Sequence, residues 1–274
     1  RRHSLRRFTS STHAGSQSAA LPPNPGMSVV VKLGVNSAEP LYRAARTRLI
    51  QALAGGQYPP GTALPPEKSL SAEFGISIGT LRKAVDELVS EGILIRQQGR
   101  GTFVASHDKE RLLYYFFHIV AFDRGKTDYP VVELIAFQRS RATALAADKL
   151  GLRVGDPVFT LRNRLSLSGQ PVMVDDITLS AARFRGLSAR RISERSGTLY
   201  QLYQEHFGLT VAHTSERLRA VLATDDVRPL LALPEHSPVM MIRRVACGYQ
   251  REPIEWRGSH VDTRSHEYFS ELGG

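Results

Sequence analysis

The tightest constraint on the fold of this chain is a pair of short helical patterns with almost no room between them. The first can begin at residues 65–67, because proline is tolerated in the first turn of a helix, and it ends at Gly75. The second can begin behind Ser77, a favourable N-cap residue, and it ends at Gly92; its apolar side is formed by Leu81, Ala84, Val85 and Leu88. Two short helices joined by so tight a turn form a helix-turn-helix unit.

Segments on both sides complete this unit. Upstream, apolar residues recur with helical spacing from Leu41 to Leu53, and the pattern stops at Gly55. Downstream, two short apolar runs, 93–96 and 102–104, flank a tip that contains glycines and an arginine, which predicts a β-hairpin. Three helices followed by a hairpin predict a winged helix.

The start of the second helix of the pair and the tip of the hairpin carry residues suited to DNA. When the apolar side of the helix faces the core, Arg82 and Lys83 face outward, and the first residues of such a helix reach base edges in the major groove. Arg82 can bond a guanine edge with two hydrogen bonds. The hydroxyls of Ser77 and Thr80 suit phosphate oxygens, and Arg100 suits the minor groove or a phosphate. The alternative is a merely solvated helix face; the complete ordered set favours DNA.

Five short motifs in this region resemble the DNA-binding domain of GntR-type regulators. They occur in order over residues 39–106, as Pro40-Leu41-Tyr42, Leu64-Pro65-Pro66-Glu67-Lys68, Gly75-Ile76-Ser77, Thr80-Leu81-Arg82-Lys83-Ala84 and Gly99-Arg100-Gly101-Thr102-Phe103-Val104. The resemblance implies that the operator is contacted by Lys68, Ser77, Thr80, Arg82, Gln98, Gly99 and Arg100. Lys83 joins this set through its outward position.

Two residues depart from the pattern of that family. Pro66 stands where the family usually has Ser or Ala, and Ile78 stands where it usually has Arg after the capping Ser. The loss of that guanidinium removes a base contact. We therefore expect the winged helix to be kept and the operator to differ from the family's common sequence.

The charge of the chain supports a DNA partner only modestly. The net charge is +10, and a basic surplus suggests a polyanionic partner. Four of these charges lie in the first residues, at Arg1, Arg2, Arg6 and Arg7. Residues 1–38 are interpreted as a disordered basic tail. The first 26 contain no acidic residue, so a transit peptide and an over-long start with Met27 as the true initiator both remain open.

Cysteine usage and known motifs exclude several classes of protein. The single cysteine, Cys247, excludes an intrachain disulfide and a cysteine zinc site, and it indicates a reducing cytoplasm. No apolar run is long enough to span a bilayer, so no membrane partner is expected. No phosphate-binding loop, dinucleotide fingerprint or Gly-x-Ser-x-Gly motif occurs, and no cofactor or metal is expected.

Beyond a short charged linker at 107–111, the pattern becomes rich in β-strands. Apolar and β-branched runs occur at 114–120, 131–137, 157–167, 171–179, 210–222, 238–248 and 254–261. Helical stretches interrupt them near 142–150, 198–207 and 225–233. With turn signals at 168–170 and 250–252, this mixture predicts an antiparallel α+β domain over 112–274.

A repeat runs through this second domain. Asp156-Pro157-Val158, Arg162 and Gln170-Pro171-Val172 in one half are answered by Ser237-Pro238-Val239, Arg243 and Glu252-Pro253-Ile254 in the other. Each half reads as helix, turn, strand, hairpin and strand. We therefore expect two pseudo-symmetric halves that form one sheet, with a pocket where they meet; a chance recurrence of Pro-Val strand starts is the alternative.

This domain resembles the UTRA effector domain of the HutC subfamily of GntR-type regulators, which has a chorismate-lyase-like fold. The resemblance rests on Gly155-Asp156-Pro157-Val158, Arg162-Asn163-Arg164, Gln170-Pro171-Val172, Thr198-Leu199-Tyr200 and Pro253-Ile254-Glu255. It implies that paired strand arginines and the acid after each hairpin line a small-molecule pocket, namely Arg162, Arg164, Asp175 and Glu255. Arg257 is a further candidate, because it occupies the repeat position of Asp175.

The paired arginines bear on the chemistry of the ligand. Arg162 and Arg164 lie two apart on a strand and so share a face, which suits a clamp on the carboxylate or phosphate of an anionic effector. The alternative is a structural ion cluster with Asp175 and Glu255. Val261 stands where some family members have a pocket tyrosine, so the class of ligand is not carried over.

The leading hypothesis is a sequence-specific DNA-binding regulator, most simply a repressor, that binds operator DNA as a homodimer and is controlled by a small-molecule effector. One alternative is a chorismate-lyase-like enzyme domain fused to a DNA-binding module. Another is a constitutive architectural DNA binder whose operator affinity no metabolite changes. The absence of a residue pair suited to acid–base catalysis favours the regulator over the enzyme.

Overall fold

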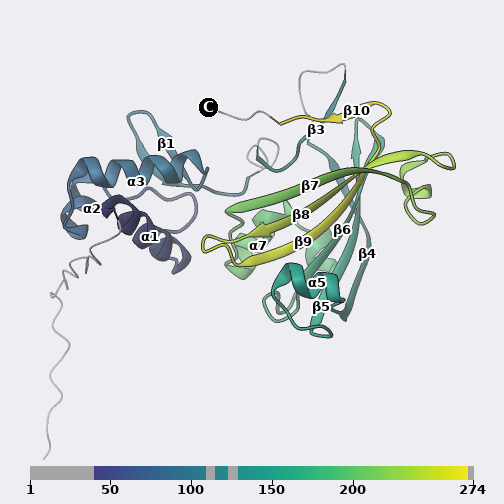
Figure 1. The fold of residues 1–274 in the computed structure, drawn as a ribbon, viewed down its shortest axis with the longest axis horizontal. Coiled ribbons are helices and arrows are strands. Elements are labelled where there is room, and N and C mark those ends of the chain that lie inside the picture. The colour runs from purple at the N-terminus through teal and green to yellow at the C-terminus, as the bar shows by residue number, and fades with distance from the viewer. Residues whose placement is uncertain (1–39, 109–114, 123–128, 271–274) are drawn as a thin grey trace, which may run out of the picture.

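The structure, a computed structural model, describes residues 40–108, 115–122 and 129–270. It has a small helical N-terminal unit and a larger C-terminal unit built on one curved sheet (Figure 1). The expected basic tail, residues 1–38, and the last three residues of the expected linker lie outside the described residues.

The N-terminal unit is the predicted winged helix. Its elements follow the predicted order, with α1 at Leu41–Ala54, α2 at Glu67–Phe74, α3 at Ile78–Ser90, β1 at Leu94–Gln97 and β2 at Gly101–Val104. The two strands form an antiparallel hairpin. The prediction of three helices and a wing is confirmed.

Local chemistry explains why α2 and α3 are separated so tightly. Gly75 ends α2 in the left-handed region at φ 66°, which a side chain at this position would strain. The side chain of Ser77 then caps α3 by accepting a hydrogen bond from the Thr80 amide at 3.1 Å. The apolar sides of the three helices meet in one core that includes Leu49, Leu53, Leu70, Phe74, Leu81, Val85 and Leu88.

The C-terminal unit is built on a six-stranded antiparallel sheet with the order β4-β5-β6-β9-β8-β7. Its strands are β4 Val131–Arg141, β5 Pro157–Leu167, β6 Gln170–Ser180, β7 His213–Leu222, β8 Pro238–Cys247 and β9 Pro253–Val261. Two short strands, β3 at Ile119–Ala121 and β10 at His266–Tyr268, pair with each other apart from this sheet. The prediction of an antiparallel α+β domain is confirmed.

The strand order shows the predicted repeat directly. Strands β4, β5 and β6 form one half, and β7, β8 and β9 form the other in mirrored order. The halves join where β6 pairs with β9, between Met173 and Val261 at one end and Leu179 and Glu255 at the other. The two-fold arrangement expected from the paired motifs is therefore the architecture of the sheet.

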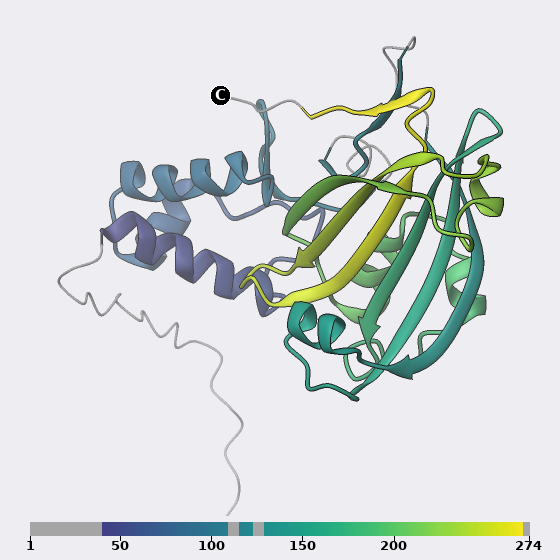
Figure 2. The same cartoon turned by 45° about the vertical axis from the view of Figure 1, so that its right-hand side comes forward.

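Helices cover the two faces of the sheet unequally (Figures 1 and 2). On the inner face lies α7, Leu199–Phe207, whose buried side packs on Leu161, Ile177 and Ala246. On the outer face lie α5, Ala144–Leu150, and the short helix η1, Pro229–Leu231. Within the described residues, no helix is both long and apolar enough to cross a membrane.

Three details differ from the sequence-based expectation. The helix expected near 225–233 is only the three-residue η1, because Pro229 cannot donate a backbone hydrogen bond and Ala232 turns left-handed at φ 50°. The strand expected at 114–120 is observed only over β3. Helix α6, Ala189–Ser193, and strand β10 were not predicted, since neither is long enough to show a periodic pattern.

The two units touch at the start of β7 and at the β8–β9 turn of the second domain. Ala212 is part of the winged-helix core, and Tyr249 of the β8–β9 turn packs against that core. His107, expected in a charged linker, is instead buried against α7. Its backbone amide donates to Gln204 Oε1 at 3.2 Å, and its carbonyl accepts from the Thr198 hydroxyl at 3.3 Å.

Candidate functional site

The start of α3 presents the expected polar residues to solvent. Ser77 is exposed, and its hydroxyl lies 2.8 Å from the Thr80 hydroxyl, so both oxygens point from the same end of the helix. Ile78 is 41% exposed beside them. The start of α3 therefore exposes an apolar side chain where the resemblance would lead one to expect an arginine.

Arg82 is held in place by α2 rather than free in solvent. Its Nε and Nη2 atoms donate to Glu67 Oε2 at 3.1 and 2.8 Å. These bonds raise the pKa of Arg82 above its ordinary value. Glu67 also lies 3.7 Å from Arg96, which pairs with Asp86 at 2.7 Å. The guanidinium is therefore oriented before any DNA arrives, and a base edge would have to compete with Glu67 for it.

The remaining expected DNA-contact residues lie at three places. Lys68 is exposed near the start of α2. Gln98, Gly99 and Arg100 are exposed at the tip of the wing, where Gly99 and Gly101 adopt φ of 72° and 113°. The ammonium of Lys83 lies 4.0 Å from the ring centroid of Tyr42 on α1, so Lys83 points to the side of α3 rather than beyond its start.

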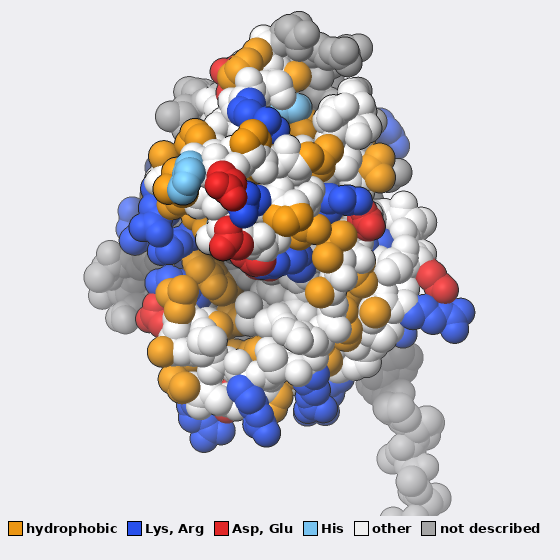
Figure 3. All heavy atoms as spheres, turned by 90° about the vertical axis from the view of Figure 1, so that its right-hand side faces the viewer, with side chains coloured by type: hydrophobic (Ala, Val, Ile, Leu, Met, Phe, Trp, Pro, Cys, Tyr) orange, Lys and Arg blue, Asp and Glu red, His pale blue; other side chains and the backbone are white. Residues whose placement is uncertain are grey.

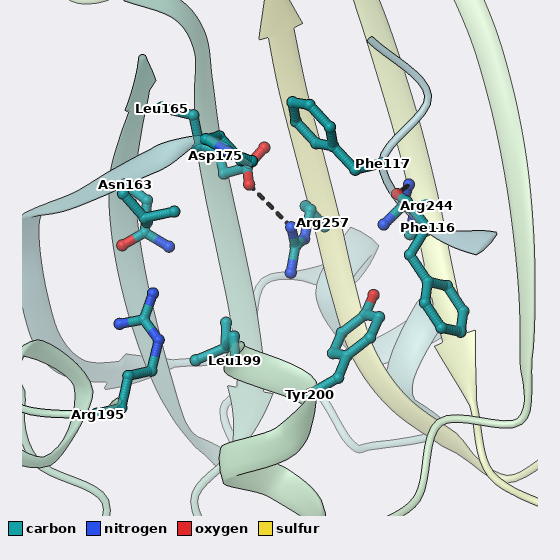
Figure 4. A pocket seen from close by; sticks show the side chains of 12 residues that line it. Phe116, Phe117, Asn163, Leu165, Asp175, Arg195, Leu199, Tyr200, Arg244 and Arg257 are labelled. Atoms are coloured by element: carbon teal, nitrogen blue, oxygen red, sulfur yellow. Dashed lines mark hydrogen bonds and ion pairs between the residues drawn. The ribbon is translucent and has the colours of Figure 1, made fainter. Parts of the chain in front are cut away.

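A second candidate site lies on the inner face of the C-terminal sheet, where the two halves meet. A cavity of about 50 Å³ opens there between the sheet, α7 and the segment before β3 (Figure 4). Its walls combine apolar rings with charged groups and are formed by Phe116, Phe117, Pro130, Val132, Asn163, Leu165, Asp175, Arg195, Leu199, Tyr200, Arg244 and Arg257. This is the pocket that the repeat predicted.

Arg257 is the centre of a buried ion cluster at this junction. Its Nη1 lies 2.8 Å from Asp175 Oδ2, and its Nε lies 2.8 Å from Glu255 Oε1. Glu255 is fully buried and also accepts from the hydroxyls of Tyr203 at 2.7 Å and Tyr200 at 3.2 Å. Burial, together with the nearby Glu255 charge, raises the pKa of Tyr200 to about 12. The two carboxylates therefore hold the guanidinium, and the tyrosines stay protonated donors.

Arg244 belongs to a second cluster that ties the pocket to neighbouring segments. Its Nε donates to Glu216 on β7 and its Nη2 donates to the Phe116 carbonyl, both at 2.5 Å. The Tyr268 hydroxyl donates to the other oxygen of Glu216. Burial alone would raise the pKa of Glu216, but Arg244 and Tyr268 outweigh it, and the pKa lies below its ordinary value. Strand β10 and the segment at Phe116 are thus fastened to the sheet through one arginine.

Of the five residues expected in the pocket, the structure brings three together. Asp175 and Arg257 line the cavity, and Glu255 lies behind Arg257. Arg162 and Arg164 share one face of β5, as expected, but it is the face opposite the pocket. Arg162 lies 2.7 Å from Asp176 and from Asp226, and Arg164 lies 2.5 Å from Glu133.

This placement corrects the expectation of a clamp formed by the paired arginines. Successive residues of a strand point to opposite faces, and Asn163, between the two arginines, is the residue that faces the cavity with Leu165. The alternative of an ion cluster is closer to the structure, although its acidic partners are not Asp175 and Glu255. They are Asp176, Asp226 and Glu133 on the outer face.

Sequence reasoning missed several residues of the pocket, notably Asn163, Tyr200, Arg195 and Arg244. The signal for two of them was present in the repeat. In the strand register, Asn163 of β5 lies opposite Asp175 of β6, and Arg244 of β8 lies opposite Arg257 of β9. Had the face been assigned from the Asp175 and Arg257 pair rather than from the arginine motif, Asn163 and Arg244 would have been selected.

Comparison with known proteins agrees with both domains. Residues 41–104 match the model of bacterial regulatory proteins of the gntR family, and residues 125–267 match that of the UTRA domain. The chain belongs to the GntR family. It carries the winged helix-turn-helix of that family joined to a UTRA domain, the combination found in HutC-type regulators.

Relatives of this GntR protein are named as regulators of transcription. It is 30% identical over 217 residues to a probable fructoselysine utilization operon transcriptional repressor of Escherichia coli K12, covering 78% of this chain and 87% of the relative. It is 28% identical over 225 residues to the histidine utilization repressor of Pseudomonas putida, covering 82% and 88% of the two chains. The GntR protein is therefore a DNA-binding transcription regulator and not an enzyme.

A solved structure supports the assignment of the second domain. The ligand-binding domain of a putative GntR-family regulator from Bordetella bronchiseptica superimposes with a TM-score of 0.56 at 30% identity, covering 58% of this chain and 99% of that one. Its whole length therefore matches the region that contains the sheet and the cavity. UTRA domains bind small-molecule effectors, and the cavity between the halves is where this one has room for a ligand.

Proposed function

We propose that this GntR regulator is a repressor that binds a near-palindromic operator as a homodimer and releases it when a small molecule occupies the pocket between the sheet halves. The observation that carries the proposal is the contact between the pocket and the linker. The ring of His107 lies 5.5 Å from that of Phe116 and 5.7 Å from that of Tyr200, and both of these residues line the pocket.

The proposed operator surface consists of the start of α3, the start of α2 and the tip of the wing. Arg82 would exchange Glu67 for a base edge, while the hydroxyls of Ser77 and Thr80 would bind phosphate. Lys68 and Lys83 flank α3. The tip of the wing would contact the DNA backbone and the next groove through Gln98, Gly99 and Arg100. The face of the UTRA domain in Figure 3 carries acidic side chains among the basic ones, which supports assigning DNA contact to the winged helix instead.

The proposed effector site consists of residues on the inner face of the sheet. Arg257 and Asp175 line it directly, and Glu255 acts through Arg257 by fixing its orientation. Arg162 and Arg164 are left out of this site because they face away from the cavity. An effector that enters must pack against the rings of Phe116 and Tyr200.

That packing offers a physical route from the pocket to the winged helix. A ligand that displaces Phe116 or Tyr200 also changes the packing of His107, whose backbone is bonded to α7 on both sides. His107 lies only three residues beyond β2, so a shift there changes how the winged helix is held. In a dimer, this would alter the spacing of two recognition helices, which must lie about one DNA turn apart. An effector that prefers one arrangement then shifts the population between them. Such a bacterial regulator would act in the cytoplasm, where the operator is.

The test is a gel shift with the DNA upstream of the protein's own gene, at several stated salt concentrations. It is run with and without the metabolites of the pathways that the neighbouring genes encode. A specific shift that one metabolite releases supports the proposal; the salt series separates phosphate contacts from base contacts. Analytical ultracentrifugation of the complex gives the number of chains per operator. Binding that no sequence or metabolite affects would contradict it.

A further inference from the structure

The three arginines that line the pocket do not have equal partners. Arg257 is paired with Asp175 and Glu255, and Arg244 is paired with Glu216. Arg195, in the loop between α6 and α7, has no carboxylate within ion-pair distance among the residues that the structure describes. One of its nitrogens donates to the Ile192 carbonyl, and its Nε is buried with no hydrogen-bond partner. Arg195 is thus the arginine of this pocket to which no carboxylate is bonded in the part of the chain that the structure describes.

Asn163, on the opposite wall of the cavity, has a buried acceptor without a hydrogen-bond partner. Its side-chain oxygen is buried, and no donor reaches it in the structure. Figure 4 shows the amide of Asn163 and the guanidinium of Arg195 pointing toward each other across the cavity. Buried donors and acceptors left without partners cost free energy, and two that converge on one space indicate a group that would satisfy both.

We propose that Arg195 and Asn163 together bind the acid end of the effector, which is a carboxylate with a hydrogen-bond donor on the neighbouring carbon, as in a 2-hydroxy carboxylic acid. The carboxylate accepts from Arg195, and the neighbouring hydroxyl donates to the Asn163 oxygen. This proposal rests on the proposed function, because it assigns chemistry to the same effector pocket. It assigns acid binding to Arg195, in a loop that the sequence analysis did not select, and not to Arg162 and Arg164 of β5.

Charge favours a carboxylate over a phosphate. Arg195, Arg244 and Arg257 carry three positive charges, and Glu216, Asp175 and Glu255 carry three negative ones, so each further negative charge that a ligand brings is unbalanced. A carboxylate supplies one negative charge, whereas a phosphate monoester supplies nearly two at neutral pH. Burial lowers the pKa of Arg195, and the nearby Arg257 charge lowers it further. A carboxylate bound beside Arg195 would stabilise the charged form of its guanidinium, which burial disfavours.

The other walls of the cavity indicate the chemistry of the rest of the ligand. Phe117, Leu165 and Leu199 form apolar walls beside the acid site. A water molecule needs roughly 10–15 Å³, so the cavity of about 50 Å³ has room for a compact group, and a larger one must displace the rings that line it. We therefore expect a short apolar or aromatic body attached to the acid.

Arg195 is also within reach of solvent. It lines a separate open groove on the surface, together with Thr198, Gln201 and His206 from the N-terminal side and body of α7. A single side chain thus lies between this groove and the inner cavity. Arg195 is therefore accessible from the groove between α6 and α7 as well as from the inner cavity.

The experiment measures binding of 2-hydroxy carboxylates with apolar side chains, from lactate to mandelate, to the full chain by calorimetry and thermal shift. Each acid is compared with its amide, which lacks the charge, and with its deoxy analogue, as mandelate is with mandelamide and phenylacetate. We expect at least one acid to bind, its amide to bind roughly tenfold or more weakly, and its deoxy analogue to bind less well.

Variants locate the binding. Arg195→Met should weaken acid binding by about tenfold or more, and Asn163→Ala should weaken the hydroxy acid but not its deoxy analogue. Arg190→Met, on α6 with an exposed side chain, removes the same charge outside the pocket and should change nothing. Circular dichroism checks that each variant is folded.

Two results would overturn the inference. One is that no acid of the panel binds; the other is that acids bind Arg195→Met as tightly as the unaltered chain. Neither result depends on DNA. A neutral metabolite that releases the operator in the gel shift would keep the proposed function and contradict the acid site. Loss of specific operator binding would contradict the proposed function while acid binding stays measurable.

Discussion

The Nη1 atom of Arg257 lies 2.8 Å from the Oδ2 atom of Asp175, so corresponding positions of the two sheet halves form one ion pair at the centre of the UTRA domain. Asp175 is also bonded by the Ser259 hydroxyl at 2.6 Å. The pair closes the junction between β6 and β9 and forms part of the pocket wall. A repeat with identical halves would place two equal charges here; the change of one to arginine makes the junction attractive.

Removing Arg257 should destabilise the domain strongly. Arg257→Met leaves Asp175 and Glu255 buried with no cation between them, and the loss of one partner from a buried pair costs about 3–5 kcal/mol. Urea denaturation followed by far-ultraviolet circular dichroism measures it. Arg164→Met breaks only a partly exposed pair with Glu133 and should cost about 1 kcal/mol or less. Equal losses in the two variants would contradict the central role of the cluster.

Arg162 provides a test of the face assignment. Because it pairs with Asp176 and Asp226 on the outer face, Arg162→Ala should lower stability by roughly 0.5–3 kcal/mol and leave effector binding unchanged. The free energy of unfolding and the effector concentration that half-releases the operator are the two measurements. If that concentration rises strongly in a variant that remains folded, the outer-face assignment is wrong.

Arg82 and Arg100 should affect DNA binding in different ways. Arg82→Ala should lower affinity roughly tenfold or more for the operator, with the preference lost at one base pair. Arg100→Ala should weaken all sequences alike and reduce the slope of log affinity against log salt by about one. Fluorescence anisotropy with single-base operator variants at several salt concentrations measures both. A uniform loss for Arg82→Ala would show that this residue contacts phosphate only.

His107 should couple the two domains without taking part in either site. His107→Ala removes the ring that packs on Phe116 and Tyr200, so the effector should still bind but release the operator less completely. Calorimetry gives the effector affinity, and anisotropy gives the operator affinity with and without effector. Full release by the bound effector in this variant would mean that the signal takes another route.

Acid should weaken the domain through Glu216. The pKa of Glu216 in the folded chain lies below its ordinary value of 4.5, so the unfolded chain binds the proton more readily. The stability it contributes is complete above the unfolded pKa and is lost as pH falls through the lower, folded pKa. Glu216→Gln should be less stable at pH 7 and should lose less on acidification to pH 3 in urea titrations. Asp225→Asn, with an almost fully exposed side chain, should keep the profile of the unaltered chain.

Much of the architecture could be predicted because it depends on local chemistry. Ser77 caps α3 by bonding an amide only three residues away, and Gly75 supplies a left-handed turn that other residues resist. The paired Pro-Val motifs marked the starts of β5 and β8, and the repeat they belong to predicted two similar halves in one sheet. The elements α6 and β10 were missed because they are too short to show a periodic pattern in the sequence.

The sequence by itself therefore determined the winged helix, the two halves of the sheet and the place where they meet, since caps, turns and strand patterns act between near neighbours. Only the tertiary structure decided which face of β5 the pocket uses. Arg162 and Arg164 alternate with Asn163, and either phase satisfies the pattern of a strand buried on both sides. The choice was made by packing: α7 covers the face of Asn163, while Asp176 and Asp226 from other segments pair with Arg162 on the opposite face.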